Sequence, residues 1–315
     1  MAVTTASQQV MPKTKMTRRQ RRRALQGYAF LSPWLIGFFA FTALPIGMSV
    51  VLAFTRYSVL RAPQLVGLRN FRHAFSGGDR LIWSSIGRSF YYALLAVPAG
   101  LVASLSLAVL LNQKLVITPV WRTFFFLPSL TPSVATAYVW RWLLNHEIGV
   151  LRVFFDFIGV TMPRWLGSME WAIPSLAIIA LWGGAGGAAM IIFLAGLQDV
   201  PQELVEAAEI DGAGRWRKFW NVTIPILSPV ILFNLIIGII GALRVFDVAF
   251  VATAGGPAYA TWFISLHIYQ TAFVYFDMGY AAALSWILAV IIITITIIQF
   301  RLSRAWVFYQ GEARE

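Results

Sequence analysis

The sequence has no cysteine and few charged side chains, and each absence excludes a class of chemistry. Without cysteine there can be no disulfide, thiolate metal site or cysteine nucleophile. Charged residues make up 12% of the 315 residues, and only 13 are acidic. The histidines, His73, His146 and His267, have no spacing typical of a zinc site. We therefore predict that they are ordinary surface residues.

Hydrophobic residues are abundant instead, at 59% of the chain, with a mean hydropathy of +0.71. This exceeds the apolar content of a soluble domain. Blocks long enough to cross a bilayer are found at residues 28–54, 89–111, 124–144, 171–197, 226–251 and 279–300. The first block is too long for a cleaved signal peptide. The predicted fold is an all-α membrane protein with six transmembrane helices.

Basic residues set the predicted orientation, because cytoplasmic flanks of membrane helices usually carry the excess of Lys and Arg. The segment before the first span holds Lys13, Lys15, Arg18, Arg19, Arg21, Arg22 and Arg23. We predict a basic cytoplasmic tail at residues 1–27, a six-helix domain at 28–305 and a second cytoplasmic tail at 306–315. Both termini are then inside. Because the basic run adjoins a membrane helix, we interpret it as a topology signal beside anionic lipid, not as a nucleic-acid site.

Prolines interrupt several predicted spans, at Pro45, Pro98, Pro128 and Pro132. Each removes a backbone donor, so we expect a bend at these positions. Residues 254–257, Ala-Gly-Gly-Pro, are predicted to form a tight external turn.

Residues 198–225, called the polar loop below, separate the fourth and fifth predicted spans and hold the one cluster of acidic residues in the sequence. Pro201 suits the first turn of a helix, and Asp199 can cap it. Glu203 and Glu206 complement the positive N-terminal end of that helix. The polar loop therefore begins with a predicted helix.

The far end of this helix is predicted at about Asp211, with Gly212 ending it in a left-handed conformation. Ala207 and Ala208 share a face with Leu204 and Asp211, which leaves that face shallow enough for another backbone to come close.

A second short helix is predicted after Gly214, lying in the headgroup zone. It groups aromatic side chains away from basic ones, namely Trp216, Phe219 and Trp220 against Arg215, Arg217 and Lys218. The polar loop is thus predicted to be an L-shaped pair of helices on the cytoplasmic side.

At these residues the chain resembles the permease subunits of binding-protein-dependent ABC importers. Their loop reads Glu-Ala-Ala, three residues, Gly, nine residues, then Ile-x-Leu-Pro. The matching residues are Glu206, Ala207, Ala208, Gly212 and Pro225, with Val222 and Ile224 as conservative replacements. Further matches at residues 66–71, 246–257 and 277–285 resemble the sugar and glycerol-phosphate importer permeases, the type that includes the larger permease of the maltose importer.

The resemblance implies that the polar loop docks into a cleft on a cytoplasmic ATPase, with Glu206 paired to a basic group. It also implies two ATPase copies, a second homologous permease, an extracytoplasmic solute-binding protein, a sugar-like substrate and a bacterial or archaeal cytoplasmic membrane. No lysine of this chain follows a glycine, as a phosphate-binding loop requires, so ATP and Mg²⁺ are assigned to the partner ATPase and no cofactor to this chain.

Six helices enclose too little space for a polar path, so we expect the solute to pass between two permeases. Trp182, Gly183 and Gly184 are candidate pathway residues, because an aromatic face beside bare backbone suits a sugar. The alternative is that these glycines only let helices pack tightly.

Arg244, Phe246 and Asp247 form a second candidate pathway group in the fifth predicted span. Charges within a membrane should face a wet cavity or each other. Arg244 and Asp247, one helical turn apart, are either substrate contacts or a mutually neutralised structural pair. An Arg244 free of Asp247 would favour a phosphorylated substrate.

Other functions remain open at this point. An ABC importer permease for a polyamine or an anion would share the polar loop. A channel or secondary transporter would need no ATPase-docking loop and usually shows inverted repeats. An intramembrane enzyme would need converging nucleophiles, and only Asp247 qualifies.

Overall fold

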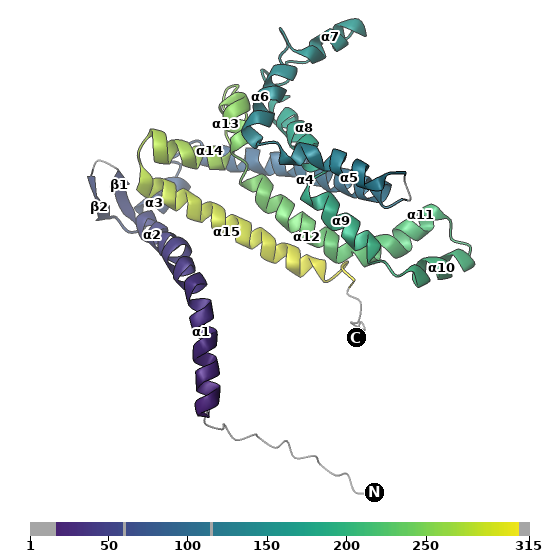
Figure 1. The fold of residues 1–315 in the computed structure, drawn as a ribbon. Coiled ribbons are helices and arrows are strands. Elements are labelled where there is room, and N and C mark those ends of the chain that lie inside the picture. Colours follow the sequence, from purple (N-terminus) through teal and green to yellow (C-terminus); the bar gives the residue numbers. More distant parts are fainter. Residues whose placement is uncertain (1–16, 59–60, 114–115, 309–315) are drawn as a thin grey trace, which may run out of the picture. The chain divides into compact units, whose positions relative to one another are not determined.

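The computed structural model describes residues 17–58, 61–113 and 116–308 (Figure 1). Of the basic residues used in the orientation argument, Lys13 and Lys15 lie outside this range. The described residues are mainly helical, as predicted. The chain divides into two compact units, Met1–Val51 and Leu52–Glu315.

The first unit is built around a helix. It comprises α1 (Arg18–Phe38), the π-helical turn η1 (Phe39–Ala43) and most of α2 (Leu44–Ala53). The run Arg21–Ala53 is long and apolar enough to cross a membrane, and none of its most apolar window is buried within the chain. A helix that is apolar all round and unburied suits a lipid environment. Helix α1 begins ten residues before the predicted span, within the segment predicted to be a tail.

The second unit opens with an antiparallel hairpin, which the sequence analysis did not predict. Strand β1 (Thr55–Ser58) pairs with β2 (Arg61–Leu65), and α3 (Arg69–Phe75) follows. The amide Nδ2 of Asn70 donates to the carbonyl oxygens of Ala53 and Thr55, both at 2.9 Å. Asn70 therefore joins α3 to the start of the hairpin.

The hairpin also contacts the start of α15 (Met278–Ser303). Ser58 forms an isolated β-bridge with Asp277, whose carboxylate accepts the backbone N–H of Tyr280 at 3.1 Å. A Cβ added at Gly279 would lie 2.1 Å from the carbonyl oxygen of Thr55, so the close approach requires glycine. Two of the motifs behind the resemblance, residues 66–71 and 277–285, thus meet at one junction.

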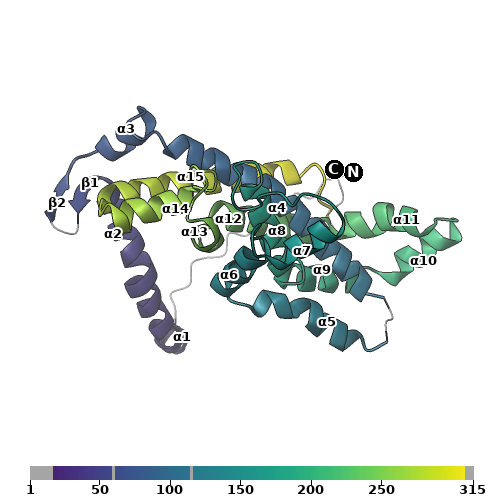
Figure 2. The same ribbon diagram turned by 90° about the horizontal axis from the view of Figure 1, so that it is seen from above.

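Helix α4 (Ile82–Leu111) lies at the centre of the second unit (Figure 2). It packs against α8 (Ala172–Gly184), α9 (Ala188–Gln198) and α12 (Ile224–Leu243). The main core cluster joins α4, α8 and α12 to α13 (Asp247–Thr253), α14 (Ile264–Tyr269) and α15. A second cluster lies where α4, α9 and α12 meet.

Among the described residues, four helices are long and apolar enough to cross a membrane, or five if the bent pair α8 and α9 counts as one span. Helix α15 matches the predicted span 279–300, and α4 begins seven residues before the predicted 89–111. The polar loop includes α10 (Gln202–Ile210), α11 (Arg215–Lys218) and the π-helical turn η3 (Phe219–Thr223). Between α14 and α15 lies η4 (Gln270–Val274).

The prediction of a continuous helix at residues 124–144 is wrong. The structure has α5 (Thr118–Phe126), the 3₁₀ turn η2 (Leu127–Leu130) and α6 (Ser133–Leu143) in its place. Pro128 and Pro132 account for the break, because each lacks a backbone N–H and restricts the residue before it. A short helix, α7 (Val150–Phe157), follows.

The predicted span 171–197 is also interrupted, by a bend of 53° between α8 and α9. Gly186 lies in the bend, and a Cβ there would be 1.9 Å from the carbonyl oxygen of Phe125 in α5. The close packing of α5 against the bend thus depends on glycine. The predicted span 226–251 is shifted: one continuous helical run covers Arg215–Leu243, and the chain breaks at Arg244 before α13.

Candidate functional site

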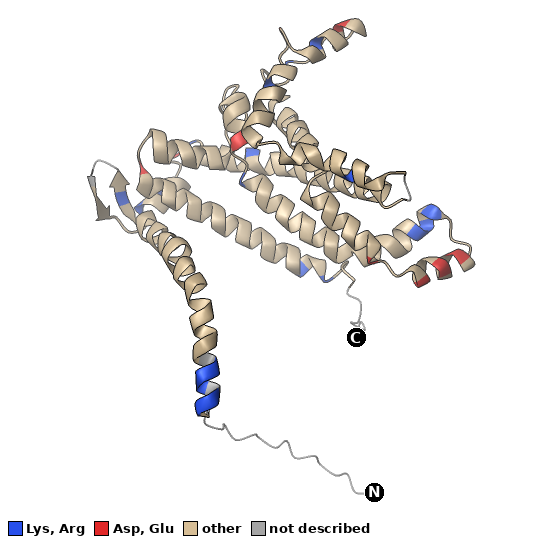
Figure 3. Ribbon diagram, viewed as in Figure 1, with Lys and Arg blue, Asp and Glu red and all other residues tan. Residues whose placement is uncertain are grey.

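Helix α10 carries most of the acidic residues of the polar loop, which Figure 3 marks in red along the ribbon. Glu203, Glu206 and Asp211 are exposed. Within the part of the chain that the structure describes, none of these three carboxylates forms an ion pair. They are therefore available to a partner. Ala207 and Ala208 follow Glu206 directly, so their face of α10 is shallow.

The corner after α10 is formed by Gly212, as predicted. Its φ is +79°, in the left-handed region where a side chain is strained. The Gly212 N–H donates to the Glu209 carbonyl at 3.0 Å, and the Ala213 N–H donates to the Ala208 carbonyl at 2.9 Å. These two bonds are the Schellman pattern, which satisfies the last carbonyls of a helix.

The predicted capping role of Asp199 is wrong. Its backbone N–H ends α9 by donating to the Ala195 carbonyl, and α10 has Pro201 as its N-cap with no side-chain cap bond. Asp199 closes one helix and lies too far back to reach the first turn of the next.

The predicted separate second helix is also wrong. Helix α11 continues through η3 into α12, so the second half of the polar loop is the beginning of a membrane-length helix. Pro225 is the second residue of α12 and follows η3, so its missing N–H lies inside the continuous run, beside the π-helical turn. The aromatic grouping is confirmed, since the Trp216, Phe219 and Trp220 rings meet edge to face. Lys218 forms an ion pair with Glu209 across the corner.

The glycines beside Trp182 do not pack against a neighbouring helix. A Cβ at Gly183 or Gly184 would meet nothing within 4 Å, which argues against tight packing at these two positions. Gly184 instead lines a cavity of about 280 Å³ together with Tyr92 and Asn234. Trp182 is 46% exposed and meets Trp140 edge to face, with ring centroids 6.0 Å apart. Gly186 and Gly187, the next two glycines along the chain, are packed instead, because a Cβ at either would lie within 3.2 Å of a neighbouring atom.

Arg244 and Asp247 do not lie on one continuous helix, contrary to the prediction. Arg244 caps the end of α12, and Asp247 begins α13. In the described residues these two side chains form no ion pair. The Asp247 carboxylate instead accepts the hydroxyl of Ser133 in α6 at 2.8 Å. Asp247 thus has a neutral partner, and Arg244 keeps an exposed, uncompensated charge.

Phe246 belongs to a row of aromatic rings that runs along α13 and α14. It stacks on Phe250 with centroids 5.3 Å apart and an interplanar angle of 15°. It also contacts Tyr269 at 4.9 Å, and Tyr269 contacts Phe273 at 5.3 Å. Of this row, only Phe246 was predicted as a site residue; Phe250 lies one helical turn further along α13, whereas Tyr269 and Phe273 belong to α14 and η4.

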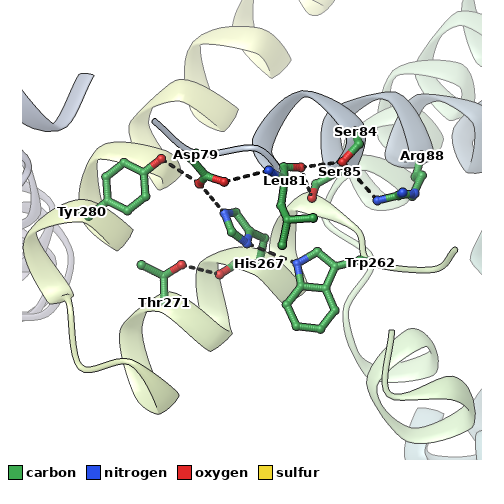
Figure 4. A network of polar contacts seen from close by, with 9 residues as sticks. All are labelled: Asp79, Leu81, Ser84, Ser85, Arg88, Trp262, His267, Thr271 and Tyr280. Carbon is green, nitrogen blue, oxygen red and sulfur yellow. Dashed lines mark hydrogen bonds and ion pairs between the residues drawn. The ribbon is translucent and has the colours of Figure 1, made fainter. Parts of the chain in front are cut away.

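The prediction that the histidines are surface residues is wrong for His267, which is only 6% exposed. Its Nε2 lies 2.7 Å from Oδ2 of Asp79, and its Nδ1 accepts the indole N–H of Trp262 at 3.2 Å (Figure 4). Because Nδ1 is an acceptor, Nε2 carries the proton and donates to Asp79. The Tyr280 hydroxyl donates to the same carboxylate oxygen at 2.8 Å. We call these four side chains the Asp79 network.

The carboxyl group of Asp79 lies before α4, outside the membrane-length helices. Burial alone would raise its pKa, but hydrogen bonds from His267, Tyr280 and the Leu81 backbone N–H outweigh that effect and lower the pKa below its usual 3.8. The carboxylate is therefore stabilised in its charged form. Asp79 and His267 are 188 residues apart in sequence, so no local motif could have revealed the pair.

Bilayer-length apolar helices around a buried helical core define an integral membrane protein. Residues 84–307 match the family described as "Binding-protein-dependent transport system inner membrane component", and the chain belongs to this family. Membership decides against the channel, secondary-transporter and intramembrane-enzyme alternatives.

Similar proteins agree with this family. The chain is 40% identical to the probable ABC transporter permease protein YesP of Bacillus subtilis, over 95% of this chain and 96% of that one. It is 32% identical to the trehalose/maltose transport system permease protein MalF of Thermococcus litoralis, over 90% and 95%. The fold is similar to a chain in the crystal structure of a bacterial ABC transporter involved in the import of the acidic polysaccharide alginate. The TM-score is 0.79 at 24% identity, covering 91% of this chain and 98% of that one.

Proposed function

We propose that this chain is a permease subunit of an ABC importer for a sugar or a related solute. It works with a second homologous permease, two copies of an ATPase that bind ATP and Mg²⁺, and an extracytoplasmic solute-binding protein. The names of similar proteins support the solute class: they include a trehalose/maltose permease and, at 32% identity, the sn-glycerol-3-phosphate permease UgpA of Pectobacterium atrosepticum.

The proposed topology has six spans with both termini in the cytoplasm, in a bacterial or archaeal cytoplasmic membrane. The segment α5 to α6 serves as the remaining span, broken at its prolines and supported by neighbouring helices. The arginines at the start of α1 and the polar loop then face the cytoplasm.

The observation that carries the coupling role is the carboxylate of Glu206, which is exposed and has no ion-pair partner among the described residues. Glu206 binds a basic group of the ATPase through a charged hydrogen bond worth about 1.5–3 kcal/mol. Ala207 and Ala208 let the ATPase backbone approach, while Glu203 and Asp211 add negative charge at the same surface. Gly212 fixes the angle of the corner, and Pro225 lies at the start of the membrane helix. Closure of the two ATPases on ATP moves the polar loop and the helix attached to it.

The solute path runs between the two permeases. In this chain it is formed by Trp182 with Gly183 and Gly184, and by the group at the end of α12. The open space at both glycines and the exposed ring of Trp182 support the first group. Arg244, Phe246 and Asp247 form the second, supported by the aromatic row and by a guanidinium with no ion-pair partner in the described residues.

The test is affinity purification of the tagged chain from its native membrane in mild detergent, with mass spectrometry of the retained proteins. We expect an ATPase, a second permease and a binding protein. Glu206→Ala and Gly212→Pro should weaken retention of the ATPase and leave the second permease bound. Glu170→Ala, which changes an exposed acid outside the polar loop, is the matched control. A chain that purifies alone, or an ATPase retained equally by all variants, would refute the proposal.

A further inference from the structure

A second cavity, of about 550 Å³, lies apart from the predicted pathway groups. Its walls come from the end of α6, residues 144–146, residues 164–167, and α13 with the turn that follows it. Helices α6 and α13 pack against each other here, so the cavity belongs to the second unit alone. The cavity walls continue into the turn at residues 254–257, where the backbone adopts positive φ at Ala254 and Gly255.

The charged side chains that line this cavity are basic. Arg141 and Arg164 both line it, and the described residues that line it include no Asp or Glu. Neither guanidinium forms an ion pair within the described chain. Arg141 makes one long hydrogen bond, 3.4 Å, to the Val251 carbonyl. The nearby carboxylate of Glu147 lies 3.8 Å from His146 Nε2. Two unpaired arginines in one concave surface attract an anion.

Aromatic rings share the cavity with the arginines. Tyr138, Trp165 and Phe250 line it, and Tyr138 is 60% exposed. Aromatic faces bind the C–H faces of sugar rings, while guanidinium groups bind carboxylates through paired hydrogen bonds. Phe250 also stacks on Phe246, so the aromatic row leads from this cavity to the proposed pathway at Arg244. Arg244, two residues before Phe246 in the sequence, is a further cation with no ion-pair partner in the described part of the chain.

We propose that this cavity is an entry site for an acidic saccharide, one whose sugar rings carry carboxylate groups. The inference rests on the proposed function and narrows its solute class. The occupant is the solute and not an acidic side chain of a partner protein, for two reasons. A volume of about 550 Å³ is that of a small-molecule site and exceeds what one Asp or Glu side chain fills. The aromatic row connects the cavity to the proposed path.

The experiment measures uptake of labelled probes by cells that carry variants of the chain in an otherwise native importer. The probes are the disaccharides of galacturonate, mannuronate and glucuronate, each with its carboxyl-reduced neutral counterpart. The test variants are Arg164→Gln, whose side chain makes no hydrogen bond or ion pair with the described residues, and Arg141→Gln with Arg164→Gln. The same pair changed to Lys preserves the charge. Arg152→Gln is the matched control, because Arg152 pairs with Asp156 and does not line the cavity.

We expect uptake of at least one acidic probe, lowered about tenfold by the double Gln variant and less by Arg164→Gln alone. The Lys pair should retain part of the uptake, because it keeps the positive charge and loses the paired hydrogen bonds. Arg152→Gln should change uptake by less than about twofold. Co-purification of the binding protein should be the same for every variant.

Four results would overturn the entry site. They are uptake of neutral probes only or of none, unchanged acidic uptake in the double Gln variant, a parallel loss for acidic and neutral probes, and a loss accompanied by release of the binding protein. The last result would assign the arginines to protein docking. In each case the importer function is tested separately, by co-purification of the ATPase and its dependence on Glu206. The entry site can therefore be refuted while the importer function is supported.

Discussion

The polar loop and the Asp79 network differ in how their charged groups are satisfied. In the polar loop, Glu206 is exposed and has no ion-pair partner in the described chain. In the network, the Asp79 carboxylate accepts hydrogen bonds from two side chains and from a backbone N–H, and its partner His267 is buried. Buried polar groups are satisfied within the chain that holds them, whereas groups reserved for a partner stay in water. Substitutions in the network should therefore affect stability, and those in the loop should affect coupling.

The largest effect is expected for Asp79→Ala. The change leaves buried donors of His267 and Tyr280 without an acceptor, at a cost of about 3 kcal/mol in the free energy of unfolding. Thermal unfolding of the purified chain in detergent measures the loss. His73→Ala is the control, because His73 is exposed and meets Tyr280 edge to face without hydrogen bonding to the Asp79 carboxylate. Equal melting temperatures for the two variants would show that the network does not stabilise the fold.

Gly212→Val should have the next largest effect, and on coupling. Valine at φ +79° costs about 1–2 kcal/mol, so the corner of the polar loop opens and retention of the ATPase falls. Gly212→Asn should be milder, because asparagine tolerates the left-handed region. The measurement is ATPase co-purification alongside the melting temperature of the permease. If valine and asparagine reduced retention equally, the backbone conformation would not be the cause.

Lys218→Ala should have a small effect. It removes the ion pair to Glu209 across the corner, and partly exposed pairs contribute about 1 kcal/mol or less. The two backbone bonds at Gly212 and Ala213 keep the corner closed. We expect ATPase retention within twofold of the unsubstituted chain. A loss as large as that of Gly212→Val would show that the side chains, and not the backbone, hold the corner.

The smallest effect is the pH dependence of the Asp79 network, which is absent at neutral pH. Because the folded pKa of Asp79 lies below 3.8, its stabilisation is complete above that pH and is lost as the pH falls through the lowered value. Between pH 5 and pH 3, the unsubstituted chain should lose more thermal stability than Asp79→Asn. Parallel losses would assign the acid sensitivity to other groups.

The helices and the polar loop could be predicted because their signals are local. Apolar runs predicted α4 and α15, and the glycine at position 212 predicted the left-handed end of α10. Proline positions predicted bends, but not that Pro128 and Pro132 together would divide residues 124–144 into separate helices. Pro128 and Pro132 are separated by less than two helical turns, so a regular α-helix cannot form again between them.

The remaining features depend on contacts between distant segments. The hairpin strands are too short and polar to stand out in a membrane sequence, and the structure holds them through Asn70 and the start of α15. The separation of Arg244 from Asp247 arises from a helix break and from Ser133 in another helix. The cavity lined by Arg141 and Arg164 is likewise formed by four segments, and no single one of them has a sequence motif typical of a binding site.

The continuous helical run Arg215–Leu243 connects the polar loop directly to the far end of α12. Its 29 residues at 1.5 Å each form a rod about 43 Å long, which starts at the Gly212 corner and ends at Arg244. Within this rod, the helix can bend at the π-helical turn η3 near its start and at Pro229 inside α12. Under the proposed function, a movement of the polar loop would be carried along this helix to the guanidinium of Arg244, so that the ATPase contact and the solute contact lie at the two ends of one helix.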